Sequence, residues 1–479
     1  MLEGLISILA VTGFGLALFW LRIPVVAQGA LQATSQGISA MFDGALDDDA
    51  KEVAVRRAGL RLIGTAFSIL WRTGAALTLA ALPLILADML GLHPARDVLA
   101  MMLTVEYAVI ATFGVMGVMY LYRRQAARGP APDVLKLDSP YSPADRFFHA
   151  LAFASPMVLK CAARLEALVM PRPAAPKAPP IFITSLARGG TTALLNAFCA
   201  QPGVATHLYR DMPFLTAPRL WHLLTGRNRQ VTRHQRAHGD GLEIDLDTPE
   251  ALEEVIWKMF WPERYTGATI PLWQAEDQRP QANRFLTDHM ARIVTARQGR
   301  RYVSKNNANI TRIPYLADAF PDCRIVVPLR RPEAHAASLL RQHRNFLARH
   351  DADDFTRRYM ADLGHHEFGA TLKPFAFPGV DPGAYDPETP DYWLAYWIAC
   401  FRGVWAHRDM CVFVLQDDLR SAPDATMTRL CTALELKSDA RTFSAFFRSG
   451  VDAAPTDIYD PALLAEAEAL YRELQTQAV

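Results

Sequence analysis

The sequence of 479 residues is poor in cysteine and has no excess of charge of either sign. Its six cysteines are scattered and include no C-x-x-C pair, so the sequence suggests neither a zinc site nor a disulfide framework. The 50 Lys and Arg residues nearly balance the 49 Asp and Glu residues, and the basic residues lack the aromatic context of a nucleic-acid-binding protein. No repeat occurs at the periods of solenoid proteins. We therefore expect a globular protein that binds no nucleic acid and needs no metal.

Long hydrophobic runs, in contrast, are present near the N-terminus. Residues 4–21 carry no charge, and the segment 98–122 carries one, Glu106. Because a bilayer span needs about 20 apolar residues, the first 122 residues predict three transmembrane helices. The chain start, Met1-Leu2-Glu3, lacks the basic residues of a cleavable signal peptide. A buried hairpin of a soluble protein is the alternative for the second and third spans. The predicted spans lie near residues 2–24, 66–90 and 98–122.

Lys and Arg residues predict the orientation of these spans, since cytoplasmic loops carry an excess of them. The loop 27–62 contains four basic residues, and three more follow the third span, at Arg123, Arg124 and Arg128. The connection 93–97 contains only Arg96. We therefore predict that the N-terminus lies outside the cytoplasm and that the large C-terminal part of the chain lies inside it, anchored to the inner or plasma membrane.

A basic juxtamembrane region is predicted between the spans and the rest of the chain. Residues 123–180 contain nine Lys and Arg against four Asp and Glu. An amphipathic helix at 144–169 would lie on the inner leaflet of the membrane. Five prolines within residues 171–180 predict a semi-rigid linker that marks a domain boundary. The predicted regions are 1–128 (membrane anchor), 129–180 (juxtamembrane helix and linker) and 181–479 (cytoplasmic domain).

Beyond the linker, short apolar strands alternate with helical patterns. Such alternation predicts an α/β domain in which helices cover both faces of a parallel sheet. The predicted strands are 181–185, 301–304, 324–329 and 411–415. The predicted helices are 191–200, 248–259, 283–298, 312–319, 333–348, 391–407, 424–435 and 460–476.

A candidate anion site follows the first of these strands. Residues 181–192 read Ile-Phe-Ile-Thr-Ser-Leu-Ala-Arg-Gly-Gly-Thr-Thr. A strand, a tight turn and a helix start in this order direct backbone N–H groups at one point, where phosphate or sulfate binds. The segment is not a Walker A motif, because the spacing G-x-x-x-x-G-K-[ST] is absent. A turn without any ligand is the alternative. The candidate residues are Arg188, Gly189, Gly190, Thr191 and Thr192.

A second candidate anion site lies in residues 324–338. Arg330 follows an apolar strand, at the end where ligands of open α/β sheets bind. Pro332 suits the first turn of the next helix, and Ser338 lies about two turns into that helix. Together the two segments predict two separate anion sites in one domain.

These two segments resemble the motifs of the sulfotransferase family that uses 3′-phosphoadenosine 5′-phosphosulfate (PAPS). The family motif P-[KR]-S-G-T-T is similar to residues 187–192, and R-[DN]-P followed by a serine is similar to Arg330-Arg331-Pro332 with Ser338. Arg331 departs from the usual acidic residue or Asn. The resemblance implies a P-loop-like sulfotransferase fold over most of residues 181–479. It further implies that residues 188–192 hold the 5′ end of PAPS, whereas Arg330 and Ser338 hold its 3′-phosphate.

The resemblance also implies catalytic roles. Besides Arg188, Lys305 at the end of a predicted strand would stabilise the charge that develops as the S–O bond breaks; a surface lysine is the alternative. Transfer to an alcohol needs a base, which the family often places about twenty residues beyond its first motif. Asp211 is favoured there, followed by His238, although Asp211 before Met212-Pro213 is also typical of a turn cap. The next candidates are Glu243 and His207.

The sequence thus predicts a membrane-anchored sulfotransferase. It would move the sulfuryl group of PAPS to a hydroxyl or amine of a lipid, glycan or other small-molecule acceptor in the bilayer, without a metal. A P-loop-type kinase or nucleotide hydrolase and a non-catalytic nucleotide-binding membrane scaffold are the alternatives.

Overall fold

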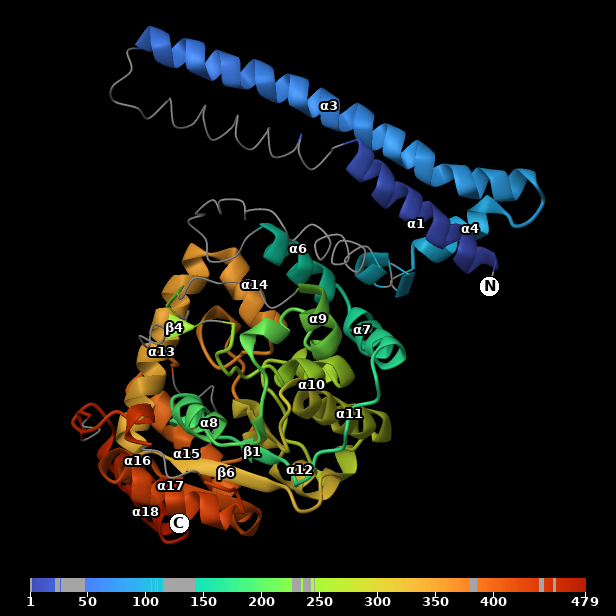
Figure 1. Ribbon diagram of the computed structural model, residues 1–479. Coiled ribbons are helices and arrows are strands. Elements are labelled where there is room, and N and C mark those ends of the chain that lie inside the picture. The colour runs from blue at the N-terminus through green and yellow to red at the C-terminus, as the bar shows by residue number, and fades with distance from the viewer. Residues whose placement is uncertain are drawn as a thin grey trace. The chain divides into compact units, whose positions relative to one another are not determined.

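The computed structural model forms two compact units, Met1–Asp133 and Val134–Val479 (Figure 1). Each unit is considered by itself. The structure describes residues 2–21, 26, 48–104, 106–107, 109, 111–114, 143–225, 234–235, 243–244, 246–379, 386–438, 443–450 and 454–479.

The first unit is built from apolar helices. Helix α1 (Leu2–Trp20) runs antiparallel to the second half of α3 (Asp48–Met89), and the short α4 (Ala95–Met102) packs at the same end (Figure 1). Ile6 of α1, Leu84 of α3 and Val98 of α4 belong to one buried cluster. The apolar faces of the three helices therefore pair with one another at this end.

Part of the first unit has the length and composition of a membrane span. Among the described residues, Gly64–Met89 is the one helical segment that meets both criteria, and Ile6–Ala17 is a shorter apolar helix. The third predicted span begins inside α4, which ends at Met102 before a turn at Leu103. The last part of that span, residues 115–122, lies outside the described residues, so the span stays a prediction.

The second unit contains a five-stranded parallel sheet. Its order is β2-β5-β1-β6-β7, and β1 pairs on one side with β5 and on the other with β6. In this register Ile183 lies opposite both Lys305 and Val326, so β1 and β5 end at the same level and β6 continues three residues beyond them, to Leu329. The predicted parallel α/β fold and its four strands are confirmed; the two-residue β2 was not predicted. The strands are β1 (Ile181–Ile183), β2 (Val204–Ala205), β5 (Arg301–Lys305), β6 (Arg324–Leu329) and β7 (Cys411–Leu415).

Helices cover both faces of this sheet (Figure 1). Ile181 and Ile183 of β1 pack into a buried cluster with α8 and α17. The intervening Phe182 points to the opposite face, where its ring lies 5.7 Å from that of Phe320. The helices of the unit are α6 (Pro143–Ala152), α7 (Pro156–Val169), α8 (Thr191–Cys199), α9 (Pro218–Thr225), α10 (Glu254–Phe260), α11 (Pro280–Ala296), α12 (Ile313–Ala319), α13 (Pro332–Ala352), α14 (Asp354–Asp362), α15 (Pro390–Ala406), α16 (Gln416–Ser421), α17 (Pro423–Ala433) and α18 (Pro461–Gln475).

The predicted juxtamembrane region differs from the observed structure. In place of one helix at 144–169 there are two, because the side chain of Ser155 caps the N-terminus of α7 by accepting from the N–H of Met157 (3.2 Å) and Pro156 begins that helix. Both helices belong to the second unit. Glu166 of α7 is 1% exposed and accepts from the backbone N–H groups of Arg219 and Leu220, each at 2.9 Å. The proline-rich segment 171–180 therefore lies within the second unit.

Candidate active site

The turn between β1 and α8 has backbone conformations that restrict its residues. Gly190 has φ +92° and Arg188 has φ +69°. A Cβ on Gly189 would lie 2.6 Å from Ser185 Oγ and 3.0 Å from the carbonyl oxygen of Leu186, so a side chain there forces the turn to open. The turn therefore delivers Thr191 directly into the first turn of α8, where backbone N–H groups have no partner within the helix.

Three side chains, one directly after β6 and two in α13, hold this turn in place. Arg330 Nη1 donates to the carbonyl oxygen of Arg188 at 2.9 Å, and His335 Nε2 donates to that of Ala187 at 2.8 Å. Arg188 Nε in turn donates to Ser338 Oγ at 3.3 Å. The two predicted anion-binding segments therefore contact one another, and Ser338 accepts a hydrogen bond from the side chain of Arg188.

A cavity at the start of α8 collects positive charge. Arg188, Arg330, Arg420 and Arg448 line it together with Gly190, Thr191 and Thr192 of the first motif, and the rings of Phe446 and Phe447 complete its wall. Guanidinium groups bind phosphate in a fork geometry, and both they and aromatic rings stack on planar groups. The arrangement suits a ligand with several anionic groups and a planar ring. Arg420, Arg448 and the two phenylalanines were not predicted, because they lie in loops and short helices that no strand-end pattern marks.

Arg331, which departs from the family motif, does not line the cavity and forms an ion pair with Asp417. Its Nε donates to Asp417 Oδ2 at 2.6 Å, and its side chain is half exposed. This ion pair joins the start of α13 to the first turn of α16. Since α16 carries Arg420, the unusual arginine helps to position one wall of the cavity.

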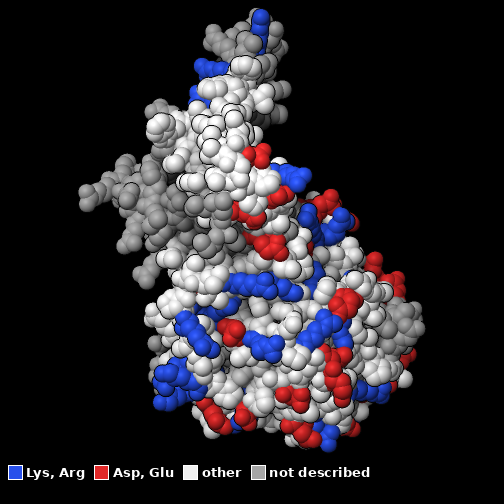
Figure 2. Space-filling model, turned by 90° about the vertical axis from the view of Figure 1, so that its right-hand side faces the viewer, with Lys and Arg blue, Asp and Glu red and all other residues white. Residues whose placement is uncertain are grey.

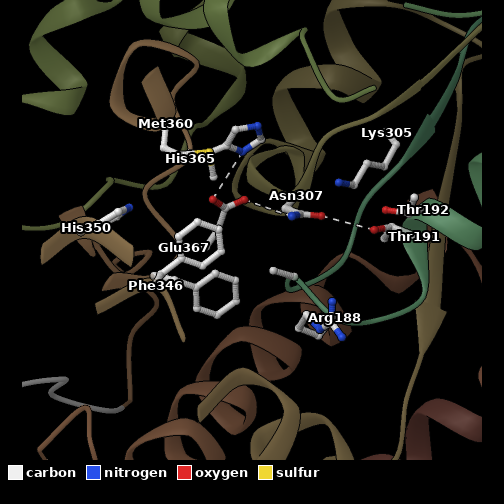
Figure 3. A pocket seen from close by; sticks show the side chains of 12 residues that line it. Arg188, Thr191, Thr192, Lys305, Asn307, Phe346, His350, Met360, His365 and Glu367 are labelled. Carbon is white, nitrogen blue, oxygen red and sulfur yellow. Dashed lines mark hydrogen bonds and ion pairs between the residues drawn. The ribbon is translucent and has the colours of Figure 1, made fainter. Parts of the chain in front are cut away.

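A second cavity adjoins the first and shares Arg188, Thr191 and Thr192 with it. Lys305, at the end of β5 and only 6% exposed, lines this cavity together with Glu367. Figure 3 shows Lys305 and Glu367 pointing into the pocket from opposite sides. Lys305 therefore ends a strand, as predicted, and the surface alternative does not apply.

A chain of polar contacts crosses the second cavity (Figure 3). Asn307, in the 3-10 helix η4 (Asn307–Thr311), donates to Glu367 Oε1 at 3.0 Å, and Thr191 Oγ1 donates to Asn307 Oδ1 at 3.4 Å. His365 Nδ1 lies 3.5 Å from Glu367 Oε2. Burial alone would raise the pKa of Glu367, but His365, Asn307 and Lys305 together lower it to about 2. Glu367 is therefore a carboxylate at neutral pH.

Sequence reasoning missed His365, Glu367 and Asn307. The first two lie in a loop between the helices α14 and α15, and their only sequence signal is a histidine two residues before a glutamate. Asn307 directly follows the strand end that was singled out for Lys305. The contacts among the three depend on the fold, which places a distant loop over the carboxyl end of β5.

The structure argues against Asp211 as the base. Its side chain is 1% exposed, and it lines neither cavity. One oxygen accepts from the N–H of Leu208 at 2.9 Å and the other forms an ion pair with Arg297. Burial would raise the pKa of Asp211, but His207 and Arg297 lower it. Asp211 thus caps a turn, which is the alternative that the sequence left open.

Of the other predicted bases, His207 lines neither cavity. His207 is buried, and its Nε2 lies 3.2 Å from His289 Nε2. His238 lies outside the described residues, and Glu243 belongs to the two-residue strand β4 (Glu243–Ile244), which pairs with β3 (His234–Gln235).

Comparison with known proteins agrees with the motifs. The sequence model of the sulfotransferase family matches residues 179–373, a segment that runs from before β1 past Glu367. This similarity indicates a transferase. Two solved structures are similar to the chain: sulfotransferase STF9 from Mycobacterium avium (14% identity, 71% of this chain and 87% of that chain covered, TM-score 0.43) and sulfotransferase STF1 from Mycobacterium tuberculosis H37Rv (16% identity, 70% and 86% covered, TM-score 0.36). No curated protein sequence matches the chain.

Proposed function

We propose that the protein transfers the sulfuryl group of PAPS to a hydroxyl group of an acceptor at a membrane. The observation that carries this proposal is the pair of adjoining cavities that share Arg188, Thr191 and Thr192. One cavity is rich in arginine, as a nucleotide with separated phosphates requires. The other combines a lysine with a carboxylate–histidine pair, as transfer to a hydroxyl requires.

The donor fits the first cavity by charge and shape. Arg188 and the N-terminus of α8 would hold the 5′-phosphosulfate, because helix N-termini and guanidinium groups both bind such anions. Arg330 and Arg448 would hold the 3′-phosphate, and Phe446 and Phe447 would pack against the adenine ring of the nucleotide. When bound, PAPS supplies an activated sulfuryl group whose leaving group is a phosphate.

The residues of the second cavity would stabilise the negative charge of the leaving group and accept the proton of the acceptor hydroxyl. Lys305 neutralises negative charge at the oxygen that leaves. Glu367 holds the imidazole of His365 through Nδ1, so that His365 accepts the proton of the acceptor hydroxyl and the carboxylate stabilises the imidazolium formed. Asn307 fixes Glu367 from the other side.

The donor site is tested by calorimetry. The purified protein should bind adenosine 3′,5′-bisphosphate far better than AMP, and Arg330→Ala should weaken that binding by roughly tenfold to a hundredfold, since a hydrogen bond to a charged group contributes about 1.5–3 kcal/mol. Equal affinity for the two nucleotides would rule out the 3′-phosphate site. Preference for ATP with Mg²⁺ would favour a kinase or nucleotide hydrolase.

The base is tested by single-turnover rates on an acceptor found by incubating membranes with radiolabelled PAPS. His365→Gln should lose more rate than Glu367→Gln while both variants still bind adenosine 3′,5′-bisphosphate. The reverse order would make Glu367 the base. Full activity of both variants would place the base elsewhere, and nucleotide binding without any transfer to membrane components would favour a scaffold.

The membrane location of the acceptor is part of the proposal. It is supported by the apolar segment Gly64–Met89, which has the length and composition of a span. An enzyme held at a bilayer meets molecules that partition into that bilayer at high local concentration.

A further inference from the structure

The second cavity is lined by segments that lie far apart in the chain. Asn307 belongs to η4, and Glu367 belongs to the loop after α14. The hydrogen bond of 3.0 Å that joins their side chains is drawn in Figure 3. Because such a bond weakens steeply as its distance and angle depart from the ideal, it requires the two segments to be held at a fixed separation.

Glu254, on α10, lines neither cavity and is 2% exposed. Both of its carboxylate oxygens pair with Arg312, Oε2 with Nη1 at 2.7 Å and Oε1 with Nη2 at 2.6 Å. The guanidinium lies 4.5 and 4.7 Å from the ring centroids of Trp257 and Trp273. Burial alone would raise the pKa of Glu254, but Arg312 lowers it, so the carboxylate is ionised at neutral pH. The bidentate pair and the rings around it hold this carboxylate in one position.

Glu254 holds the segment that carries Asn307. Its Oε2 accepts from Nδ2 of Asn306 at 2.7 Å. Oδ1 of Asn306 accepts from the N–H of Ala308 at 3.1 Å and thereby caps the start of η4. An asparagine suits this place because one side chain donates to a carboxylate and accepts from an N–H at the same time. Asn306 stands between Lys305 and Asn307 in the chain, so its position constrains both neighbours.

Glu254 also contacts the loop that carries His365. Gly364, which follows α14, has φ +80°, and a Cβ there would lie 2.6 Å from Cγ and 3.4 Å from Cβ of Glu254. Only glycine combines this backbone conformation with so close an approach. One turn further along α10, Lys258 donates to the carbonyl oxygen of Ala361, in the last turn of α14. The end of α14 and the start of the loop are therefore packed against α10.

We propose that Glu254 is a positioning residue for the transfer reaction: through one fixed carboxylate it sets the separation of the segments that carry Asn307 and Glu367. The inference rests on the proposed function and adds to it a residue that touches neither ligand. A small shift of either segment would lengthen the contact between Asn307 and Glu367 and move the carboxylate that holds His365. Misplaced groups of this kind slow the chemical step, because that step depends on their orientation.

The test changes the two contacts of Glu254, since substituting Glu254 itself would break a buried ion pair and endanger folding. Gly364→Ala disturbs the loop, and Asn306→Ala disturbs the start of η4. The measurement is hydrogen exchange, followed by mass spectrometry, on the full-length protein in detergent. Each variant should speed amide exchange by about tenfold in the opposite segment, 306–311 for Gly364→Ala and 363–369 for Asn306→Ala, because local openings share one anchor. Faster exchange in the substituted segment alone would overturn the proposal.

Two further variants make this result specific. Gly203→Ala is the matched control, because Gly203 has φ +82° and a Cβ there would meet only the side chain of Arg300, at 3.3 Å or more. Gly203 precedes β2, which pairs with the start of β5, and exchange in both segments should be unchanged in this variant. Asn307→Ala removes the direct contact with Glu367. Adding Gly364→Ala to it should still speed exchange in 306–311; no further change would mean that the segments are joined through the cavity and not through Glu254.

Rates separate positioning from stability. Calorimetry with adenosine 3′,5′-bisphosphate counts the folded sites in each sample and measures their affinity. The single-turnover rate per site should fall by about tenfold or more in Gly364→Ala and Asn306→Ala, whereas affinity should change by less than about threefold. Gly203→Ala should keep the parent rate. Fewer sites with an unchanged rate per site would show a purely structural role and overturn the proposal. A parent protein that transfers no sulfuryl group would contradict the proposed function, and the exchange measurement would still decide whether Glu254 joins the two segments.

Discussion

Lys305 is a buried cation at the proposed site. It is 6% exposed and faces a cavity that holds a carboxylate. A group that acts mainly in the transition state changes turnover more than ground-state affinity. We therefore expect Lys305→Ala to lower turnover by about 10²–10³, as loss of one preorganised donor does, with a much smaller change in affinity for adenosine 3′,5′-bisphosphate. Steady-state rates and calorimetry on the same samples measure both quantities. Lys177→Ala, at an exposed lysine, is the control, and full turnover of Lys305→Ala would remove its catalytic role.

His366 should make the protein less stable in mild acid. Burial, helped by Lys258, lowers the pKa of His366 to about 4, whereas a histidine in the unfolded chain titrates near 6.5. Between these two pKa values His366 is protonated in the unfolded chain but neutral in the folded protein. The free energy of unfolding therefore falls as the pH drops from about 6.5 to 4. At pH 5 the effect is of order 1–2 kcal/mol.

The variant His366→Asn isolates this contribution. Asparagine can still donate to the carbonyl oxygen of Thr371, which His366 Nδ1 contacts at 3.2 Å, but it does not titrate. The difference in Tm between pH 7 and pH 5 should be smaller in the variant than in the parent protein. An unchanged difference would show that other groups, such as the buried His289, whose pKa is also lowered, dominate the acid response.

Sequence and structure agree best where the chemistry of a residue depends on its immediate neighbours. The turn at Arg188 to Thr192 could be predicted because glycine, threonine and a preceding strand determine it locally. The proposed base could not be predicted, because the contacts of Glu367 with Asn307 and Lys305 join residues about sixty positions apart in the chain. The distance of Asp211 from the first motif predicts a base, but in the structure its carboxylate forms a buried salt bridge with Arg297 and stabilises the fold.

Among the elements, α7 is joined to α9 of the second unit by one buried carboxylate, that of Glu166. Its surroundings made a surface helix a reasonable prediction, since the region is basic and amphipathic. Glu166, however, lies in the buried face and accepts from the first backbone N–H groups of α9 at 2.9 Å each, while Arg292 Nε lies 3.9 Å away. The N-terminus of α9 gains a partner from another element, and α7 becomes part of the second unit.

Glu166→Ala should therefore destabilise the second unit. The substitution leaves two buried N–H groups and the guanidinium of Arg292 without this partner, which costs about 3–5 kcal/mol when a buried ionic contact is broken on one side. Glu276→Ala, at an exposed position in the same unit, should change the stability by less than about 0.5 kcal/mol. Chemical denaturation of both variants in detergent measures the difference. If the two variants unfolded alike, α7 would contribute no more than a linker does.

At the scale of the whole molecule, the surfaces of the two units differ in how their charged side chains are distributed. Figure 2 shows acidic and basic side chains interspersed on one face of the second unit, in line with the near-zero net charge. In the first unit the same view shows charged side chains toward the ends of the described helices and mostly uncharged ones between them. Large apolar side chains such as Phe67, Leu70 and Leu86 are exposed there, at 70%, 71% and 54%. Water is a poor solvent for such a surface, whereas a bilayer is a good one.

A topology experiment follows from this distribution and from the predicted excess of Lys and Arg in cytoplasmic loops. A reporter active only in the cytoplasm should be active when fused after Val479, and a reporter active only outside it should work when fused within 93–97. The protein should leave the membrane fraction only with detergent. The opposite reporter pattern would reverse the predicted orientation, and release by mechanical cell breakage alone would mean that the first unit does not span a bilayer.

The guanidinium of Arg188, held by Ser338 between two cavities, has a thermodynamic consequence. Because Arg188, Thr191 and Thr192 belong to both walls, a ligand in one cavity changes the surface that the other ligand meets. Binding at the two places is then linked, and linkage is reciprocal: the factor by which a bound nucleotide changes the affinity for the acceptor must equal the factor by which the acceptor changes the affinity for the nucleotide. One side chain and two hydroxyl groups would therefore carry the coupling between the proposed nucleotide and the proposed acceptor.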